Sequence, residues 1–262
     1  NGPYYRPFRD FILRRGALCH LHLFASRNRA FRDDAVLQEN VILRLERGAP
    51  QGPVMVSTST DDTFADLETH EYPFCRIVHP DAPQRFVHIP KSPAESAMEQ
   101  SPAIRCRLAE LGIHVSTGPV VAFRLKTHLR DMPSEDTVPL LYPGHFSRSG
   151  TQWPLLGMKH PNALVYNADT RKWLYPPGFY CVVRRLSSKE ERRRLVASVV
   201  EPHVFGDVPA LGFENHLNVF HDNRHGLPEA LARGLAAFLN TTAVDDAFRR
   251  FGVNTRPPMP AS

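Results

Sequence analysis

Several sequence patterns that mark common enzyme classes are missing from this chain. It has no HExxH pair, no G-x-S-x-G elbow, no G-x-x-x-x-G-K-[ST] loop and no G-x-G-x-x-G loop. These absences argue against a zincin-type metal site, an α/β-hydrolase, and a phosphate or dinucleotide cradle within the chain. None of the lysines follows an acidic residue at the spacing acid-x-Lys, so the metal site of a common nuclease class is not supported either.

Cysteine is also scarce, and long apolar runs are absent. The four cysteines, Cys19, Cys75, Cys106 and Cys181, form no CxxC pair, which excludes a zinc ribbon. No signal peptide opens the sequence, and no apolar run is long enough to span a bilayer. We therefore expect reduced thiols and a cytoplasmic protein without a membrane segment.

Lysine is rare although the chain is basic. The net charge is +5 and the isoelectric point about 9.2, yet only five of the 32 basic residues are lysines. Arginine binds phosphate and guanine in a bidentate manner that lysine cannot reproduce, so this composition suits a polyanionic partner. A GC-rich genome, which favours arginine codons, explains it equally well. With 42% hydrophobic and 23% charged residues, the composition is that of a globular protein.

Histidines occur in three groups along the chain, but they lack the spacing of a metal site. Metal binding needs convergent ligands, usually with a local pair on one helix face. We therefore expect no metal and interpret most of these residues as surface or hydrogen-bonded histidines. The groups are His20 and His22; His70, His79 and His88; and His216, His221 and His225.

The first sixty residues have the pattern of a sheet edge. Helical spacing predicts a helix over 4–15, and alternation predicts strands over 18–24, 41–45 and 54–58. The turn residues 48–52 lie between the last two strands, which predicts a hairpin. This segment suits the edge of a larger α/β sheet and would make a poor domain by itself.

The pattern changes twice further along the chain. Residues 61–111 are rich in proline and read as a connector ending in a short helix over 101–111. Strands are expected over 115–123, 138–142 and 179–185. A capping-box pattern at 187–191 predicts a helix through Val200, and a final helix is expected from Pro228 through Phe248.

One loop region favours nucleic acid. The stretch 145–162 combines Ser, Arg, Gln, Lys and His with the aromatic Trp153, which are types that contact phosphates and base edges. A solvated loop whose Trp153 packs on the core is an equal alternative. The predicted DNA-contacting residues are Arg124, Lys126, His145, Ser147, Arg148, Ser149, Trp153, Lys159, His160 and Asn162.

An ordered set of segments resembles the DNA adenine-N6 methyltransferases of type II restriction–modification systems, in the class with a C-terminal recognition domain. Each segment is weakly specific alone, but together they follow the family's order over nearly the whole chain. The segments are Asn1–Arg9, His22–Arg27, Val36–Ile42, Val115–Val121, Pro161–Leu164, Ser187–Arg193, Phe213–Asn218 and Gly234–Asn240.

The resemblance implies an α/β fold in two parts. Residues 1–60 resemble the last strands of the Rossmann-like catalytic domain, 61–111 a connector, and 112–262 an α+β target recognition domain. The family's S-adenosylmethionine pocket and Asn-Pro-Pro-Tyr motif lie upstream of Asn1, and Asn1-Gly2-Pro3-Tyr4 does not replace that motif because Gly2 stands for a proline. The end also departs from the family, because 249–255 stops short of its usual Gly-His-Thr-Gln stretch.

The resemblance also implies a function and a target-base pocket. We expect part of a site-specific adenine methyltransferase that recognises double-stranded DNA, with Phe31, Leu37 and Gln38 beside the flipped base. Leu37 as a plain core residue is an equal alternative. Since the chain starts without Met and lacks the cofactor motifs, we expect no S-adenosylmethionine to bind it alone and assign it no catalytic residue. Two further hypotheses are a specificity subunit that needs a catalytic partner, and an inactive gene remnant.

Overall fold

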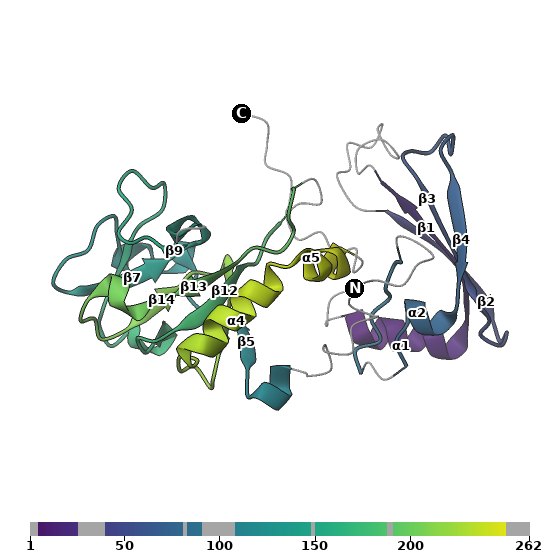
Figure 1. Cartoon of the computed structure of the whole chain (residues 1–262). Helices are drawn as coiled ribbons and strands as arrows, with labels where there is room; N and C mark the ends of the chain where they lie inside the picture. Colours follow the sequence, from purple (N-terminus) through teal and green to yellow (C-terminus); the bar gives the residue numbers. More distant parts are fainter. Residues whose placement is uncertain are drawn as a thin grey trace. The chain divides into compact units, whose positions relative to one another are not determined.

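The computed structural model describes residues 5–25, 40–80, 83–90, 108–147, 150–187 and 191–249 (Figure 1). The chain forms two compact units, Asn1–Gln100 with Asp246–Ser262, and Ser101–Asp245. Each unit has its own sheet structure and its own hydrophobic core.

The first unit is built on a mixed four-stranded sheet with the order β2-β1-β3-β4. Strand β1 runs antiparallel to β2 and parallel to β3, and β4 is antiparallel to β3. The predicted helix and three strands are confirmed, and the expected connector supplies the fourth strand. The elements are α1 (Arg6–Arg15), β1 (Gly16–Phe24), β2 (Val41–Arg47), β3 (Val54–Ser59), β4 (Glu68–Tyr72) and α2 (Phe74–Ile77).

The predicted hairpin of β2 and β3 is wrong, because both strands pair with β1 and flank it. The turn between β2 and β3 instead contributes a side chain that bonds to β1. Gln51 accepts a hydrogen bond from the Leu18 N–H at 2.8 Å and donates to the Leu18 carbonyl at 3.0 Å. On this side of β1, pairing with β3 begins only at His20. The Gln51 amide therefore takes the place of a neighbouring strand at Leu18, next to the register shift between Leu18 and His20.

The core of the first unit is formed by β1, β3, the end of β4 and α2, whereas β2 is exposed along its whole length. The core contains Leu18, Leu21, Val54, Val56, Tyr72, Ile77 and Val78. The exposed edge strand instead presents four large apolar side chains, Val41, Ile42, Leu43 and Leu45. An exposed apolar edge strand is a site where another chain or segment can pair.

The second unit contains two main sheets, of orders β11-β14-β7-β10-β6 and β13-β12-β15-β5, and the hairpin β8–β9. Its strands are β5 (His114–Thr117), β6 (Leu129–Arg130), β7 (Thr137–Leu141), β8 (Phe146–Ser147), β9 (Gly150–Thr151), β10 (Ala163–Val165), β11 (Leu174–Tyr175), β12 (Tyr180–Arg184), β13 (Ala197–Val200), β14 (Leu211–Phe213) and β15 (Leu217–His221). Its helices are η2 (Leu108–Leu111), η3 (Ala122–Arg124), η4 (Lys126–His128), η5 (Pro143–His145), η6 (Arg171–Trp173), η7 (Pro202–Phe205), α4 (Glu229–Leu239) and α5 (Thr242–Arg249), which extends past Asp245.

The two main sheets of this unit enclose an aromatic core. Tyr175, Tyr180 and Phe213 meet edge to face with centroids 5.2–5.9 Å apart, a favoured geometry for aromatic rings. Gly118 allows β5 to approach this core, because a Cβ there would lie 2.2 Å from the Glu214 carbonyl oxygen. Helix α4 covers the β12–β13 side (Figure 1).

The helix predicted through Val200 is wrong, because Ala197–Val200 forms β13. The β-branched valines there fit a pleated strand, and pairing with β12 buries Ala197 and Val200. Asn240, at the end of α4, protects this edge strand by accepting from the Ala197 N–H and donating to its carbonyl, at 3.0 and 2.8 Å. The helices predicted after Pro228 are confirmed as α4 and α5.

Other predictions are met in part. The strand expected over 115–123 ends at Thr117 and gives way to η3, while β7 and β12 match the strands expected over 138–142 and 179–185. Of the helix expected over 101–111, residues 101–107 lie outside the described residues and 108–111 form a 3₁₀ turn. The observed class is mixed α/β. Across the described ranges, every helix is too short or too polar to cross a membrane.

Gly234 is expected to be a site where alanine stabilises the protein. It lies inside α4, and a Cβ there would meet nothing within 4 Å. Gly234→Ala should raise the free energy of unfolding by about 0.5–1 kcal/mol, because glycine loses more backbone freedom on folding. Gly118→Ala, the same change beside the Glu214 carbonyl, should lower the free energy of unfolding. Urea unfolding of both variants measures the two changes, which should have opposite signs. Changes of the same sign would contradict the packing described above.

Candidate nucleic-acid interface

The buried side chain of Asn162 holds together the loop predicted to contact DNA. Its Oδ1 accepts hydrogen bonds from the Leu155 N–H at 2.8 Å and from His145 Nε2 at 2.9 Å. Its Nδ2 donates to the carbonyls of Asp131 at 2.8 Å and Leu155 at 3.1 Å. The Asn162 carbonyl accepts from Trp153 Nε1 at 2.7 Å. One residue thus joins three segments that are distant in sequence.

His145 completes this network as a neutral imidazole. It is fully buried, and its Nδ1 accepts the Tyr142 N–H at 3.0 Å, which leaves Nε2 to donate to Asn162. Burial lowers the pKa of His145, and its hydrogen bonds to Asn162 and Tyr142 only partly offset that effect. The histidine therefore stays uncharged at neutral pH and acts as a bridge between the two residues.

Three of the predicted DNA-contacting residues consequently lie inward. His145 and Asn162 are 0% and 2% exposed, so neither offers the surface that a direct DNA contact needs. Trp153 is half-buried, with its ring 5.6 Å from Phe205 in an edge-to-face contact. These three side chains position the loop, and the alternative in which Trp153 packs on the core matches this geometry.

Five of the other predicted residues are exposed: Arg124, Lys126, Ser147, Lys159 and His160. The His160 ring stacks on Tyr142 with centroids 4.7 Å apart. The Arg124 guanidinium lies 5.5 Å from the ring centroid of Phe123, which is 67% exposed. Exposed cations beside aromatic rings are groups that can bind phosphates and stack on bases. Arg148 and Ser149 lie outside the described residues.

The structure adds three cations that the sequence interpretation missed. β6 pairs with β10 and places Arg130 opposite Ala163, next to the end of the loop. Arg171 and Lys172 follow on η6, where they lie over the rings of Tyr166 and Trp173 at 4.9 and 5.2 Å. In the sequence, Arg171 and Lys172 could have been noticed only because aromatic residues lie close to them, and this pattern is not specific to DNA-binding proteins.

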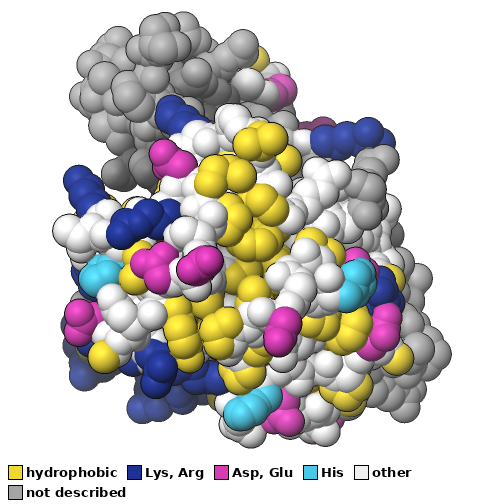
Figure 2. All heavy atoms as spheres, turned by 90° about the vertical axis from the view of Figure 1, so that its left-hand side faces the viewer, with side chains coloured by type: hydrophobic (Ala, Val, Ile, Leu, Met, Phe, Trp, Pro, Cys, Tyr) yellow, Lys and Arg dark blue, Asp and Glu magenta, His cyan; other side chains and the backbone are white. Residues whose placement is uncertain are grey.

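Figure 2 shows one face of the second unit as a space-filling surface. Hydrophobic side chains gather in a band down this face, and Lys and Arg side chains lie largely beside the band. The exposed large apolar residues of this unit include Phe123, Met132, Leu156 and Trp173. A surface that mixes exposed apolar groups with cations suits a polyanion that carries flat bases.

The predicted target-base pocket cannot be placed, because Phe31, Leu37 and Gln38 lie outside the described residues. At the carboxyl ends of the parallel strands β1 and β3, side chains form hydrogen bonds with one another. His22 Nδ1 lies 2.8 Å from Ser57 Oγ, and its Nε2 lies 3.2 Å from Ser59 Oγ. Burial and the neighbouring His20 lower the pKa of His22.

These strand ends do not fit S-adenosylmethionine. In an open α/β sheet a nucleotide cofactor binds at the carboxyl ends of the strands, where a glycine-rich loop leaves room for it. Here the hydroxyl and imidazole groups bond one another, and the sequence has no such loop. No step of a methyl transfer is therefore assigned to these residues.

Removing the Asn162 carboxamide should loosen the loop and destabilise the second unit. Asn162→Ala removes the partners of the buried His145 Nε2 and of both backbone groups of Leu155, at a cost of about 2–4 kcal/mol. Asn162→Asp keeps the acceptor side and should remove the two Nδ2 hydrogen bonds. Urea unfolding gives the free energies, and limited proteolysis tests loop opening. An alanine variant as stable as the wild type would contradict the central role of this side chain.

Acid should destabilise the second unit through His145. Its pKa is lowered in the folded state, so below the unfolded value of about 6.5 the unfolded chain binds more protons. The stabilisation is full above about pH 6.5 and is lost as the pH falls towards the lowered pKa. His221, whose burial also lowers its pKa, acts in the same direction.

Urea unfolding at about pH 7.5 and about pH 5.5 measures this loss. His145→Gln should be less stable at the higher pH and lose less stability on acidification, whereas the exposed His225→Gln should retain the wild-type difference. The same pH difference in both variants would show that His145 does not contribute.

Comparison with known proteins gives two relatives, while no protein-family model matches the chain. Type II methyltransferase M.BsuBI of Bacillus subtilis is 50% identical over 256 residues, which are 98% of this chain and 51% of that protein. Type II methyltransferase M.PstI of Providencia stuartii is 40% identical over 258 residues, again 98% of this chain and 51% of the relative. The chain is therefore homologous, over nearly all of its length, to about half the length of two type II methyltransferases.

Proposed function

We propose that this chain is the DNA-recognising portion of a site-specific DNA adenine-N6 methyltransferase of a restriction–modification system. The observation that carries the proposal is the exposed set of cations around a rigidly held loop, in a chain whose relatives are named type II methyltransferases. Such a protein would use Arg124, Lys126 and Lys159 on the phosphate backbone of double-stranded DNA.

Rigidity of the loop matters for this function. A target base must leave the duplex before its amino group can react, and this costs a few kcal/mol. A recognition domain supports that step by gripping the flanking backbone. Asn162 fixes the loop before DNA arrives, so less conformational entropy is lost on binding. In the complete enzyme, S-adenosylmethionine would supply the methyl group. It would be bound by residues that are not part of this chain.

A second candidate function is a specificity subunit that works with a separate catalytic chain. It is favoured by the apolar edge strand β2, with Ile42 51% exposed, and by Phe8 and Phe11 on α1, at 58% and 57%. Either a catalytic partner or further sequence of the same protein could cover this surface. Under the third hypothesis, an inactive remnant, purified chain should bind no duplex.

The proposed function predicts DNA binding that weakens steeply with salt. Replacing Arg124, Lys126 and Lys159 with Gln should weaken binding and lower the slope of log K against log salt by roughly 0.9 for each phosphate that the protein no longer neutralises. The matched control replaces three exposed arginines of the first unit, Arg14, Arg44 and Arg47. Fluorescence anisotropy with a labelled mixed-sequence duplex gives both quantities. Salt-independent binding, or equal effects of the two triple variants, would overturn the proposal.

A further inference from the structure

A second group of arginines lies on the turn between β12 and β13. The turn contains Arg184, Arg185, Arg192, Arg193 and Arg194 within eleven residues. None of these positions is among the predicted DNA contacts. Of the five, Arg185 and Arg192 are exposed and Arg194 is buried.

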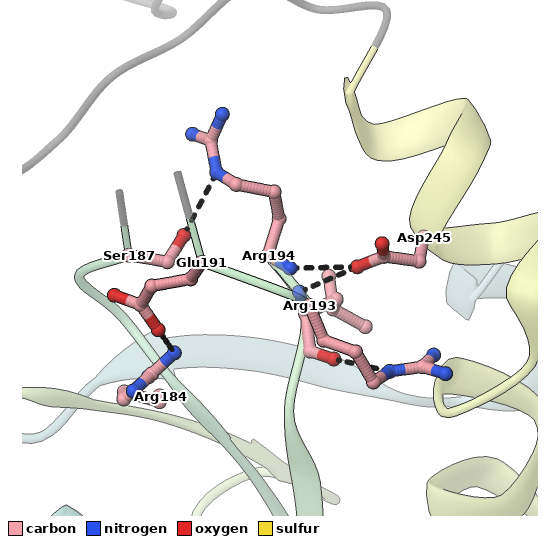
Figure 3. A network of polar contacts seen from close by, with 7 residues as sticks. Arg184, Ser187, Glu191, Arg193, Arg194 and Asp245 are labelled. Atoms are coloured by element: carbon pink, nitrogen blue, oxygen red, sulfur yellow. Dashed lines mark hydrogen bonds and ion pairs between the residues drawn. The ribbon is translucent and has the colours of Figure 1, made fainter. Parts of the chain in front are cut away.

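Polar contacts within the second unit hold the described residues on both sides of this turn, of which 188–190 lie outside the described ranges (Figure 3). Asp245 is 5% exposed, and its Oδ1 accepts the backbone N–H groups of Arg194 and Leu195 at 2.8 and 2.9 Å. Arg194 Nε donates to Ser187 Oγ at 3.1 Å, and Arg184 is paired with Glu191. Arg193 donates to the carbonyls of Leu195 at 3.5 Å and Thr241 at 2.9 Å, and the Arg194 guanidinium points away from those of Arg184 and Arg193 (Figure 3).

The turn borders a groove of about 860 Å³. One wall is the β8–β9 hairpin, the floor is β13, and the opposite wall is α4, where Ala236 and Ala237 leave room. Arg193 lies at the turn side of the groove. A smaller cavity of about 300 Å³ includes Arg184 and shares three lining residues with the groove, Phe146, Val196 and Ser198.

Arginines outnumber the acidic groups beside the groove. Arg233 binds Glu201 at 2.7 Å and Glu229 at 2.9 Å. Together with the five arginines of the turn, Arg233 gives six positive charges against the four negative charges of Glu191, Glu201, Glu229 and Asp245, a net charge of +2. Hydroxyl groups of Ser147 and Ser198 line the same groove. Guanidinium and hydroxyl groups together form a donor set for phosphate oxygens.

We propose that this groove binds the sugar–phosphate backbone of the DNA duplex, as a second contact beside the loop held by Asn162. The inference rests on the proposed function and extends it to β13, α4 and the arginine turn. Arg193 and the serine hydroxyls contact phosphate oxygens, and the small alanines of α4 allow the backbone to approach the helix. The remaining turn arginines raise the local positive potential.

Ala237 allows a test that removes no native interaction. It is exposed on α4 and lines the groove. Glu and Lys are similar in size and both are good helix formers, so Ala237→Glu and Ala237→Lys differ mainly in charge. The control pair is Ala65→Glu and Ala65→Lys, at an exposed position of the first unit. Binding of the whole chain to a labelled mixed-sequence duplex is measured by anisotropy at low salt, and circular dichroism melting checks folding.

The groove contact predicts opposite effects of the two charges. Ala237→Glu should raise Kd by about threefold to tenfold and Ala237→Lys should lower it similarly, as one unit charge a few ångströms from a phosphate in water predicts. The Ala65 pair should leave Kd unchanged. If the triple change at Arg124, Lys126 and Lys159 weakens binding while the Ala237 pair has no effect, the groove inference is overturned and the proposed function stands.

Two other results are also decisive. Weaker binding by both Ala237 variants would overturn the electrostatic contact, because only a steric effect is independent of the sign of the charge. A wild-type chain that binds no duplex at low salt would overturn the proposed function and the groove contact together.

Discussion

The carboxamide of Asn162 is the interaction on which the arrangement of the candidate interface depends. Asn162 directly precedes β10, an inner strand of the five-stranded sheet, so its backbone belongs to the core. Its side chain then fixes Leu155, His145 and the end of the segment at Asp131. The loop carrying Lys159 and His160 is therefore anchored beside β10, although both of these side chains are exposed. A binding loop held this way loses little entropy when a ligand orders it.

A side-chain amide also satisfies the backbone at two strand positions that lack a neighbour. Gln51 pairs with both backbone groups of Leu18, and Asn240 pairs with both backbone groups of Ala197. A primary amide places an N–H donor beside a C=O acceptor, so it can satisfy both backbone groups of one residue at a strand edge without adding a strand. At β13 this leaves the edge closed to other chains. β2 has a row of exposed apolar side chains instead. The edge at β13 is thus adapted to solvent, whereas the edge at β2 is suited to a partner.

The local pattern of apolar and polar residues was enough to predict those helices and strands whose buried face matches that pattern. The amphipathic residues after Pro228 and the apolar runs of β1 and β12 specify helix and strand by themselves. Pairing could not be predicted, because β2 and β3 are separated by a short turn yet both bond β1. The capping-box pattern at 187–191 failed because burial against β12 outweighs a helix start signal. At the candidate site, composition predicted a DNA-contacting loop, but it could not separate exposed Lys159 from buried His145, since both are polar types whose role depends on burial.

The β8–β9 hairpin connects the two basic surfaces. β8 begins immediately after His145, which the Asn162 network holds, and Thr151 at the end of β9 donates to the Val199 carbonyl at 2.7 Å. Phe146, Ser147 and Gly150 of this hairpin form a wall of the groove beside the arginine turn. The loop cations and the groove therefore share one rigid support within the second unit. A duplex whose backbone is held at both places would be fixed in register by parts of the protein that are already ordered before binding. Phosphate contacts of this kind position the protein so that other side chains can contact base edges between them.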